Sequence, residues 1–293
     1  MATRTMSDKP HAKLSEQVLE LMPAWSLEQL DAFEYLSGGY SNHNYLFRYR
    51  HNNGAQQQYV LRVPFMTQLY VDRVYEKRYH QQLHATGLQS WKILALNENT
   101  GVMISPWLEG KLLADTKPTP SPTVLSRYLA NLHEKLPNPG RAYPVIELAQ
   151  AWLGQVPRKI VTELKRWPEE RKPAHNDLNP WNILLEGPVW HTLDWEFAGY
   201  NDPWFDVVAL CYGLELSQSQ LLEFASLYLA DRQWTEPSLL QLQDTLHLAA
   251  IAFELREWSW ASYQLQQGNV REEIEWQAES YKTRLSERLG SLT

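Results

Sequence analysis

The sequence predicts an α+β protein of two parts: a small N-terminal part with an antiparallel sheet and one helix, and a larger, mainly helical C-terminal part. The first part is indicated by short apolar runs between glycine-rich or polar turns within 33–104. The second part is indicated by apolar residues at helical spacing through most of 121–289. With 293 residues, the chain has about twice the length of a typical domain. We therefore place two domains at 1–105 and 106–293.

The N-terminal part begins with a short helix predicted over 14–21. Alternating apolar patterns then predict an antiparallel meander, because a glycine-rich turn and a polar turn separate its three runs. A helix and two further strands complete this part and close the sheet. The predicted strands and helix are, in order, 33–36, 45–49, 58–63, the helix 68–84, then 93–96 and 102–104.

The C-terminal part begins with a helix whose start is marked by Ser121, a good N-cap, and by Pro122 at the first helical position. A helical stretch over 146–167 is interrupted near Pro157, and two short strands around a Gly-Pro turn are predicted within 182–195. Further helices are predicted from residue 221, over 237–267, and over 270–289, with Gly290 as a C-cap.

The charge balance argues against a nucleic-acid-binding protein, which usually carries a basic surface. The formal net charge is −7 and the pI is about 5.7. This balance mildly favours a cationic substrate, although ordinary solubility explains it better. We therefore expect no nucleic-acid partner.

The cysteine content and the hydropathy pattern bear on location. The sequence holds one cysteine, Cys211, which excludes an internal disulfide and a cysteine-based zinc site and fits a reducing cytoplasm. The N-terminal residues 1–13 lack the apolar segment of a signal peptide. The longest apolar stretch, near 248–253, is too short to cross a bilayer. We expect a cytoplasmic protein without a membrane segment.

The strongest functional signal is the run from His175 to Asn182, His-Asn-Asp-Leu-Asn-Pro-Trp-Asn, followed twelve residues later by Asp194-Trp195-Glu196. Phosphoryl transfer requires a carboxylate to orient the attacking hydroxyl and accept its proton, and oxygen ligands to hold Mg²⁺ against the phosphates. Asp177, Asn182 and Asp194 supply this set if the intervening hairpin returns the chain. A polar loop and a hairpin that contain these residues by chance are the alternative, which the two spaced motifs together disfavour.

These motifs resemble those of the aminoglycoside phosphotransferase and choline kinase superfamily, whose members have His-x-Asp-x-x-x-x-Asn and Asp-(Trp/Phe/Tyr)-Glu. The resemblance covers 35–210 and implies a two-lobed, protein-kinase-like fold with ATP and Mg²⁺ as cofactors. It implies that Asp177 is the catalytic base, that Asn182 and Asp194 are magnesium ligands, and that His175 fixes the catalytic loop.

The turn that contains Gly38, Gly39, Ser41 and Asn42 lies between two predicted strands. Glycines let backbone amides approach phosphate oxygens, although a Gly-Gly pair in this position is more often just a hairpin turn. The absence of a Gly-x-x-x-x-Gly-Lys-(Ser/Thr) motif argues against a P-loop kinase. In this sequence context, we expect the four residues to contribute to nucleotide binding.

Arg62 follows in the third strand, where the family has Lys or Arg for the α- and β-phosphates. Glu76 on the next helix is its expected partner, with Arg73 and Lys77 as competitors for that carboxylate. A solvated strand residue is the alternative for Arg62. The segment with Ser105 and Trp107 resembles the family hinge, whose backbone holds adenine.

The substrate is expected to be a small-molecule alcohol, most closely choline or ethanolamine, because Gly-Gly-Tyr-Ser-Asn-His-Asn-Tyr (38–45) and Asp-Trp-Glu-Phe-Ala-Gly-Tyr-Asn-Asp-Pro (194–203) resemble bacterial choline kinases. Aromatic faces and carboxylates bind quaternary ammonium groups. The candidate contacts are Glu196, Trp204, Glu254, Trp258 and Trp260. Packing between helices is the alternative for the tryptophans, and Arg256 within the cluster counts against a purely cation-binding surface.

Other functions remain open at this point. Thiamine, an aminoglycoside and a sugar-like alcohol are alternative acceptors within the same superfamily. A catalytically inactive binding protein is disfavoured because the predicted base and both metal ligands are present. A protein kinase is disfavoured because no evident Asp-Phe-Gly and Ala-Pro-Glu pair marks an activation segment.

Overall fold

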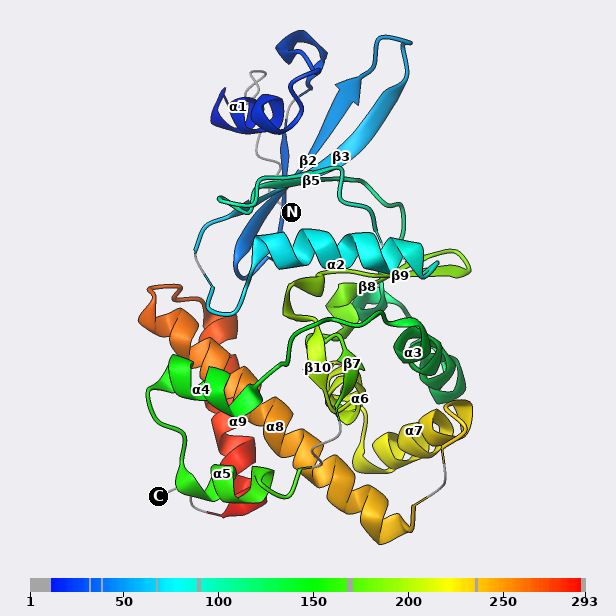
Figure 1. Cartoon of the computed structure of the whole chain (residues 1–293), viewed down its shortest axis with the longest axis vertical. Helices are drawn as coiled ribbons and strands as arrows, with labels where there is room; N and C mark the ends of the chain where they lie inside the picture. Colours follow the sequence, from blue (N-terminus) through cyan, green and yellow to red (C-terminus); the bar gives the residue numbers. More distant parts are fainter. Residues whose placement is uncertain are drawn as a thin grey trace. The chain divides into compact units, whose positions relative to one another are not determined.

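The computed structural model of the chain describes residues 12–31, 33–37, 39–66, 68–88, 91–167, 171–234 and 237–290 (Figure 1). Its contacts divide the described residues into two compact units, one from 1–111 and 185–196 and the other from 112–184 and 197–293. The division differs from the single boundary that we predict after residue 105, because the segment 185–196 groups with the N-terminal residues. Among the described residues, no helix is long and apolar enough to cross a membrane.

The first unit is built on a five-stranded sheet with the strand order β1-β2-β3-β5-β4, in which every neighbouring pair is antiparallel. The predicted meander is confirmed, and β2 and β3 extend beyond the predicted runs because their backbone pairing continues from Asn42↔Pro64 to Arg50↔Gln56. The elements are α1 (Ala12–Leu21), η1 (Leu27–Gln29), β1 (Glu34–Leu36), β2 (Asn42–Arg50), β3 (Gln56–Pro64), α2 (Arg73–Ala85), β4 (Ala95–Leu96) and β5 (Met103–Pro106).

Alternate residues of the strands supply two apolar clusters. Leu14 and Val18 of α1 pack with the buried side chains Phe47, Leu61 and Ile104 of the sheet. A smaller cluster contains Trp91, Leu96 and Met103. Since Met103 and Ile104 are neighbours in β5, their side chains point to opposite faces, which assigns one cluster to each face of the sheet.

Helix α2 begins at Arg73, later than the predicted residue 68. Asp72 occupies the N-cap, and its carboxylate accepts hydrogen bonds from the amides of Val74 and Tyr75. The helix runs beside the sheet (Figure 1). The helix lies on the face that carries the Trp91 cluster, because His80 packs edge-on against Trp91 and Tyr79 packs against Trp195.

The second unit is mainly helical, as predicted, and its longest helix is α8 (Leu239–Gln266). Ser238 and Gln241 form a capping box at its start, and α4, α5, α6 and α9 all pack against it (Figure 1). A small antiparallel sheet pairs β7 with β10. The other elements of this unit are η2 (Leu113–Asp115), α3 (Pro122–Lys135), α4 (Val145–Leu153), α5 (Arg158–Leu164), β7 (Lys172–Ala174), η3 (Pro180–Asn182), β10 (Gly199–Asn201), α6 (Trp204–Gly213), α7 (Gln218–Asp231) and α9 (Glu272–Leu289).

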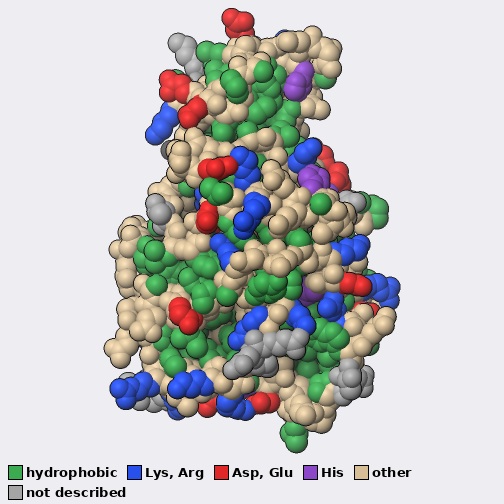
Figure 2. Space-filling view, in the orientation of Figure 1, with side chains coloured by type: hydrophobic (Ala, Val, Ile, Leu, Met, Phe, Trp, Pro, Cys, Tyr) green, Lys and Arg blue, Asp and Glu red, His purple; other side chains and the backbone are tan. Residues whose placement is uncertain are grey.

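A three-stranded sheet has the order β6-β8-β9. The strands β8 (Ile183–Glu186) and β9 (Val189–Thr192) form the predicted hairpin, and β6 is Lys111–Leu112. Beyond β9, η4 (Trp195–Phe197) carries the second motif. On the face shown in Figure 2, the described Lys and Arg side chains lie among acidic and apolar ones.

Candidate active site

The loop after β7 is anchored to helix α6 by the buried carboxylate of Asp206. One carboxylate oxygen accepts a hydrogen bond from the amide of His175 at 2.7 Å, and the other accepts one from the amide of Asn176 at 2.8 Å. His133 Nε2 lies 3.1 Å from the same carboxylate. Burial alone would raise the pKa of Asp206, but the hydrogen bond and charge of His133 lower it below its usual value. The loop backbone is therefore fixed by an ionised group within the core.

Asn176 has a left-handed backbone conformation, with φ of 67°. This conformation is costly for a residue with a Cβ, although Asn tolerates it better than most. Its buried amide compensates by donating to the carbonyl of Phe197 at 3.1 Å and accepting from Asn201 Nδ2 at 2.8 Å. These bonds tie the loop to β10 and turn the next residue, Asp177, out of the core.

The carboxylate of Asp177 is held on both of its oxygens. Asn182 Nδ2 donates to Oδ2 at 3.0 Å and to the Asp177 carbonyl at 2.8 Å. Arg256 Nη2 on α8 donates to Oδ1 at 2.7 Å. The side chain of Asp177 is 17% exposed, so the carboxylate is fixed but accessible. Because Asn182 uses its nitrogen in these bonds, its amide oxygen is left for a cation, which suits the predicted role as a metal ligand.

Within the first unit, Arg62 and Glu76 form the predicted pair. The guanidinium binds both carboxylate oxygens, at 2.8 and 2.9 Å, which is the bidentate geometry of strong Arg–carboxylate pairs. Arg73 also binds Glu76, at 2.7 Å, whereas Lys77 pairs with Glu98. Burial alone would raise the pKa of Glu76, but the charges and hydrogen bonds of Arg62 and Arg73 lower it to about 2.

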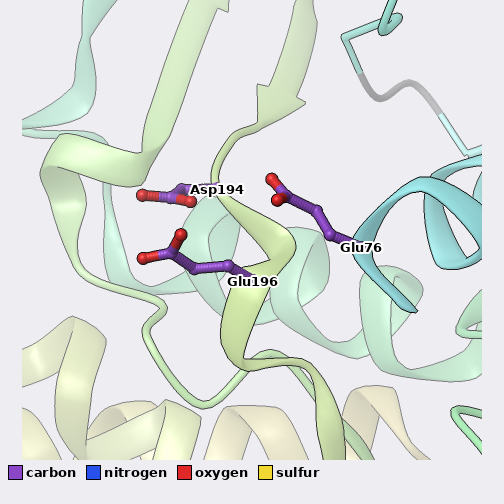
Figure 3. A group of neighbouring side chains, drawn as sticks. All are labelled: Glu76, Asp194 and Glu196. Atoms are coloured by element: carbon purple, nitrogen blue, oxygen red, sulfur yellow. The ribbon is translucent and has the colours of Figure 1, made fainter. Parts of the chain in front are cut away.

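Asp194 and Glu196 continue this network. Arg73 Nη1 binds Glu196 at 2.6 Å, and Arg62 Nη1 lies 3.9 Å from Asp194 Oδ1. Figure 3 shows Glu76, Asp194 and Glu196 facing one another, with one carboxylate oxygen of each within 4.8 Å of the others. Asp194 is the most exposed of the three, with 33% of its side chain accessible.

The donor set of this cluster suits a hard divalent cation. Carboxylate oxygens are the ligands that Mg²⁺ prefers, and Mg²⁺ is commonly held by one or two carboxylates together with phosphate oxygens and water. Glu76 is engaged by two arginines and Glu196 by one, so Asp194 is the carboxylate best suited to a metal. Its φ of 59° is a second left-handed conformation at a candidate site residue.

Comparison with known proteins gives the family. The family model described as "Phosphotransferase enzyme family" matches residues 32–138 and 139–240, which is more than half of the chain. The chain belongs to the phosphotransferase enzyme family. Among curated proteins, LicA of Haemophilus influenzae is 26% identical over 203 residues, which are 62% of this chain and 58% of LicA. The match thus spans less than two thirds of that relative.

Solved structures show the fold of this phosphotransferase. Choline kinase LicA from Streptococcus pneumoniae matches with a TM-score of 0.74 and 21% identity, covering 94% of this chain and 98% of LicA. A choline/ethanolamine kinase family protein from Mesorhizobium loti matches with a TM-score of 0.67 and 19% identity, covering 95% and 94% of the two chains. These likenesses confirm the predicted protein-kinase-like α+β fold.

In this phosphotransferase, the glycine-rich turn precedes and enters β2. Gly38 lies outside the described residues. A Cβ on Gly39 would lie 2.1 Å from the carbonyl oxygen of Asn42, so only glycine fits there. Ser41 and Asn42 are buried, and the Ser41 carbonyl accepts the amide of Phe65 at 3.3 Å. The turn is thus compact, and its nucleotide-binding role stays a prediction.

The predicted hinge residues lie at the end of β5. Ser105 is buried and pairs with Val60 of β3. The amide of Trp107 donates to the carbonyl of Gln58 at 2.9 Å, and its indole donates to Glu109 at 3.1 Å. The Trp107 amide is therefore engaged in extending the sheet, and an adenine at this segment would have to use other backbone groups.

The predicted substrate contacts are for the most part engaged in packing or in ion pairs within their own units. Glu254 is fully buried, and both of its oxygens accept from Arg288, at 2.7 and 3.0 Å. Trp204 is buried edge-on against Tyr228. The remaining contacts are Glu196, bound to Arg73 in the first unit; Trp260, which is buried; and Trp258, which is half-buried. Their substrate roles stay predictions, and packing accounts for most of what the structure shows of them.

The structure adds residues that the sequence motifs do not reveal. Arg256 reaches Asp177 from a helix 79 residues further along the chain, and Asp206 anchors the loop from α6. Arg73 links Glu76 to Glu196. For Arg256 the sequence carries a signal, since an arginine within the largely apolar and acidic run Phe253–Trp260 requires a partner when it is buried. Arg73 is already a predicted competitor for Glu76, but its bond to Glu196 is not predicted.

Proposed function

We propose that this phosphotransferase is an ATP- and Mg²⁺-dependent kinase that transfers the γ-phosphate to the hydroxyl of a small cationic alcohol, choline or ethanolamine. The geometry of Asp177 is the observation that carries the reaction type. Its carboxylate is held by Asn182 and Arg256, yet it remains partly accessible. A fixed and accessible carboxylate can orient a substrate hydroxyl and accept its proton.

The nucleotide would be held by residues of the first unit. The glycine-rich turn offers backbone amides, and Arg62, fixed by its bidentate pair with Glu76, offers a permanent charge for the α- and β-phosphates. Asn182 and Asp194 are the proposed ligands of Mg²⁺, which when bound neutralises charge on the phosphates. A LicA crystal structure that this chain resembles contains AMP, which supports a nucleotide as cofactor.

The substrate class is supported by the relatives. The solved structures that resemble this chain include a choline kinase, a choline/ethanolamine kinase family protein and an ethanolamine kinase from Plasmodium vivax. The net charge of −7 favours a cation over an anion at long range. Thiamine and aminoglycosides are the competing acceptors, and an aminoglycoside phosphotransferase with hygromycin B is also among the similar structures.

The test is Mg²⁺-dependent ATP consumption with choline, ethanolamine, thiamine and a mixed set of aminoglycosides, each product identified by phosphorus NMR. We expect a phosphomonoester of choline or ethanolamine to form only in the presence of Mg²⁺. Turnover of thiamine or an aminoglycoside alone would keep the reaction type and overturn the substrate. If no acceptor is phosphorylated and ATP does not bind, the kinase proposal is wrong.

A further inference from the structure

Arg256 is a buried cation placed directly against the predicted catalytic base. It lies in the middle of α8 with 5% of its surface exposed. Its guanidinium donates to Asp177 Oδ1 at 2.7 Å, to Glu257, and through Nε to the Tyr143 hydroxyl at 3.3 Å. It also lies 5.1 Å from the centre of the Phe197 ring. All three guanidinium nitrogens are therefore used, and the group has a single well-defined position.

The surroundings of Arg256 are those of a cation site that the protein fills with its own side chain. Two carboxylates, Asp177 and Glu257, the hydroxyl of Tyr143 and the ring of Phe197 surround one guanidinium. Burial alone would lower the pKa of Arg256, but the charges of Glu257 and Asp177 raise it well above its usual value. The guanidinium thus remains charged whenever the site is in use.

This permanent charge matters for an acceptor that is itself a cation. A choline-like alcohol carries a positive charge two carbons from its hydroxyl, and an isolated carboxylate attracts the charged end more strongly than the neutral end. A substrate bound to Asp177 through its ammonium group would present the wrong end to the base. The guanidinium beside Oδ1 opposes this binding mode, because like charges repel and the charge of a buried guanidinium is screened less than that of an exposed one.

We propose that Arg256 is a positioning residue that fixes the Asp177 carboxylate and reserves it for the hydroxyl end of the acceptor by repelling the cationic end. The second half of this statement rests on the proposed function, since it requires a cationic alcohol. Glu257 keeps the guanidinium in place from the other side, and Gln277 Nε2 in turn donates to Glu257 at 2.5 Å. The arrangement lies entirely within the second unit.

The proposal is tested with a matched pair of acceptors, choline and its neutral isostere with a tert-butyl group in place of trimethylammonium. Arg256→Met removes the charge, Arg256→Lys keeps it without the fork, and Arg166→Met, at an exposed ion pair, is the control. For Arg256→Met we expect kcat/KM to fall by about a hundredfold with both acceptors, because the base is misplaced. With choline alone, kcat and KM should fall further by a common factor, the mark of non-productive binding.

Arg256→Lys keeps the positive charge, so the additional fall of kcat and KM with choline should disappear. Because lysine lacks the planar fork, kcat/KM should recover only in part with either acceptor. The positioning role is overturned if Arg256→Met retains kcat/KM within about twofold of wild type for both acceptors. The orienting role is overturned if choline and its isostere lose kcat and kcat/KM to the same extent. If Arg256→Met does not fold, Arg256→Gln, which removes the charge but keeps a hydrogen-bond donor, takes its place, because a purely structural arginine predicts equal losses with both acceptors and the proposal predicts an additional fall of kcat with choline alone.

A second measurement separates failure of this inference from failure of the proposed function. The melting temperatures of Arg256→Met, Asp177→Asn and the double variant form a cycle that requires no substrate. We expect the double variant to melt well above the value given by adding the two single shifts. Each single variant leaves one charged side chain without its partner, whereas the double variant removes both charges. Additive shifts would overturn the contact, whereas a wild type without turnover of any alcohol overturns the proposed function alone.

Discussion

The two units hold their candidate active-site carboxylates in different ways. In the first unit, Glu76 and Glu196 are held by side-chain charge, through Arg62 and Arg73. In the second unit, the loop that carries Asp177 is held through its own backbone amides, which donate to the Asp206 carboxylate. Arg256 then binds the Asp177 side chain itself. The first arrangement joins charged side chains to one another, whereas the second joins backbone amides to one charged side chain. The two regions should therefore respond differently to changes in charge, pH and packing.

The largest effect is expected from removal of the Asp194 carboxylate, the most exposed of the three carboxylates that face one another. Asp194→Asn should lower kcat/KM by about a hundredfold or more, because one ligand of the activating cation is lost. Raising the Mg²⁺ concentration should recover part of the activity. Asp244→Asn, at an exposed ion pair on α8, is the control and should match wild type. An Asp194→Asn variant with unchanged dependence on Mg²⁺ would remove Asp194 from the metal site.

Removing Arg62 tests whether charge holds the first unit together. Arg62→Met leaves the buried Glu76 with Arg73 alone and should lower the free energy of unfolding by about 3 kcal/mol. Pairing it with Glu76→Gln should restore much of this loss, since the uncompensated charge is then gone. Denaturant unfolding of the two single variants and the double variant measures this. Equal instability of Arg62→Met and the double variant would show that packing, not charge, is responsible.

The pH dependence sharpens the same contrast. The pKa of Glu76 is lowered from 4.5 to about 2 in the folded protein, so its stabilising contribution is present above 4.5 and is lost as the pH falls towards 2. The loss should amount to roughly 3 kcal/mol. Unfolding measured across this window without Mg²⁺ should show a shallower decline for Glu76→Gln than for wild type. Parallel curves would contradict the assignment.

The smallest effect concerns packing beneath the catalytic loop. A Cβ on Gly213 would lie 2.2 Å from Cδ of Pro180, so Gly213→Ala should displace the loop, lower stability by about 1–3 kcal/mol and lower kcat. Gly54→Ala, at a turn with open space around it, is the matched control and should cost about 1 kcal/mol with no change in kcat. Equal kcat in the two variants would show that the loop does not depend on this contact.

The sequence predicts those parts of the fold and site that local patterns encode. The meander, the hairpin and most helices follow from alternation, helical spacing and turn residues. Helix α6 is not predicted as a helix, because the run Val207–Cys211 is apolar on all sides and has no period to distinguish a buried helix from a strand. The start of α2 is misplaced because the cap at Asp72 outweighs the apolar pattern before it.

The site, like the fold, can be predicted where its contacts join residues that are close in the sequence. Spacing within one loop brings Asn182 to Asp177, and the strand–helix pair brings Glu76 to Arg62. Arg256 cannot be assigned to Asp177 from sequence, because the face that α8 turns towards the loop is set by packing against α4, α6 and α9. The burial of side chains on α8 cannot be assigned from sequence either. Glu254 and Trp260 are predicted substrate contacts, and the structure buries both among the helices.

The central claim is that Asp177 acts as the base of a kinase, and Asp177→Asn tests it most directly. With the acceptor that wild type uses best, we predict that the variant binds Mg²⁺-ATP with unchanged affinity and loses at least about a hundredfold in kcat. Asp244→Asn, measured beside it, should match wild type. An Asp177→Asn variant that retains wild-type kcat would contradict the claim and move the search for the base elsewhere in the second unit.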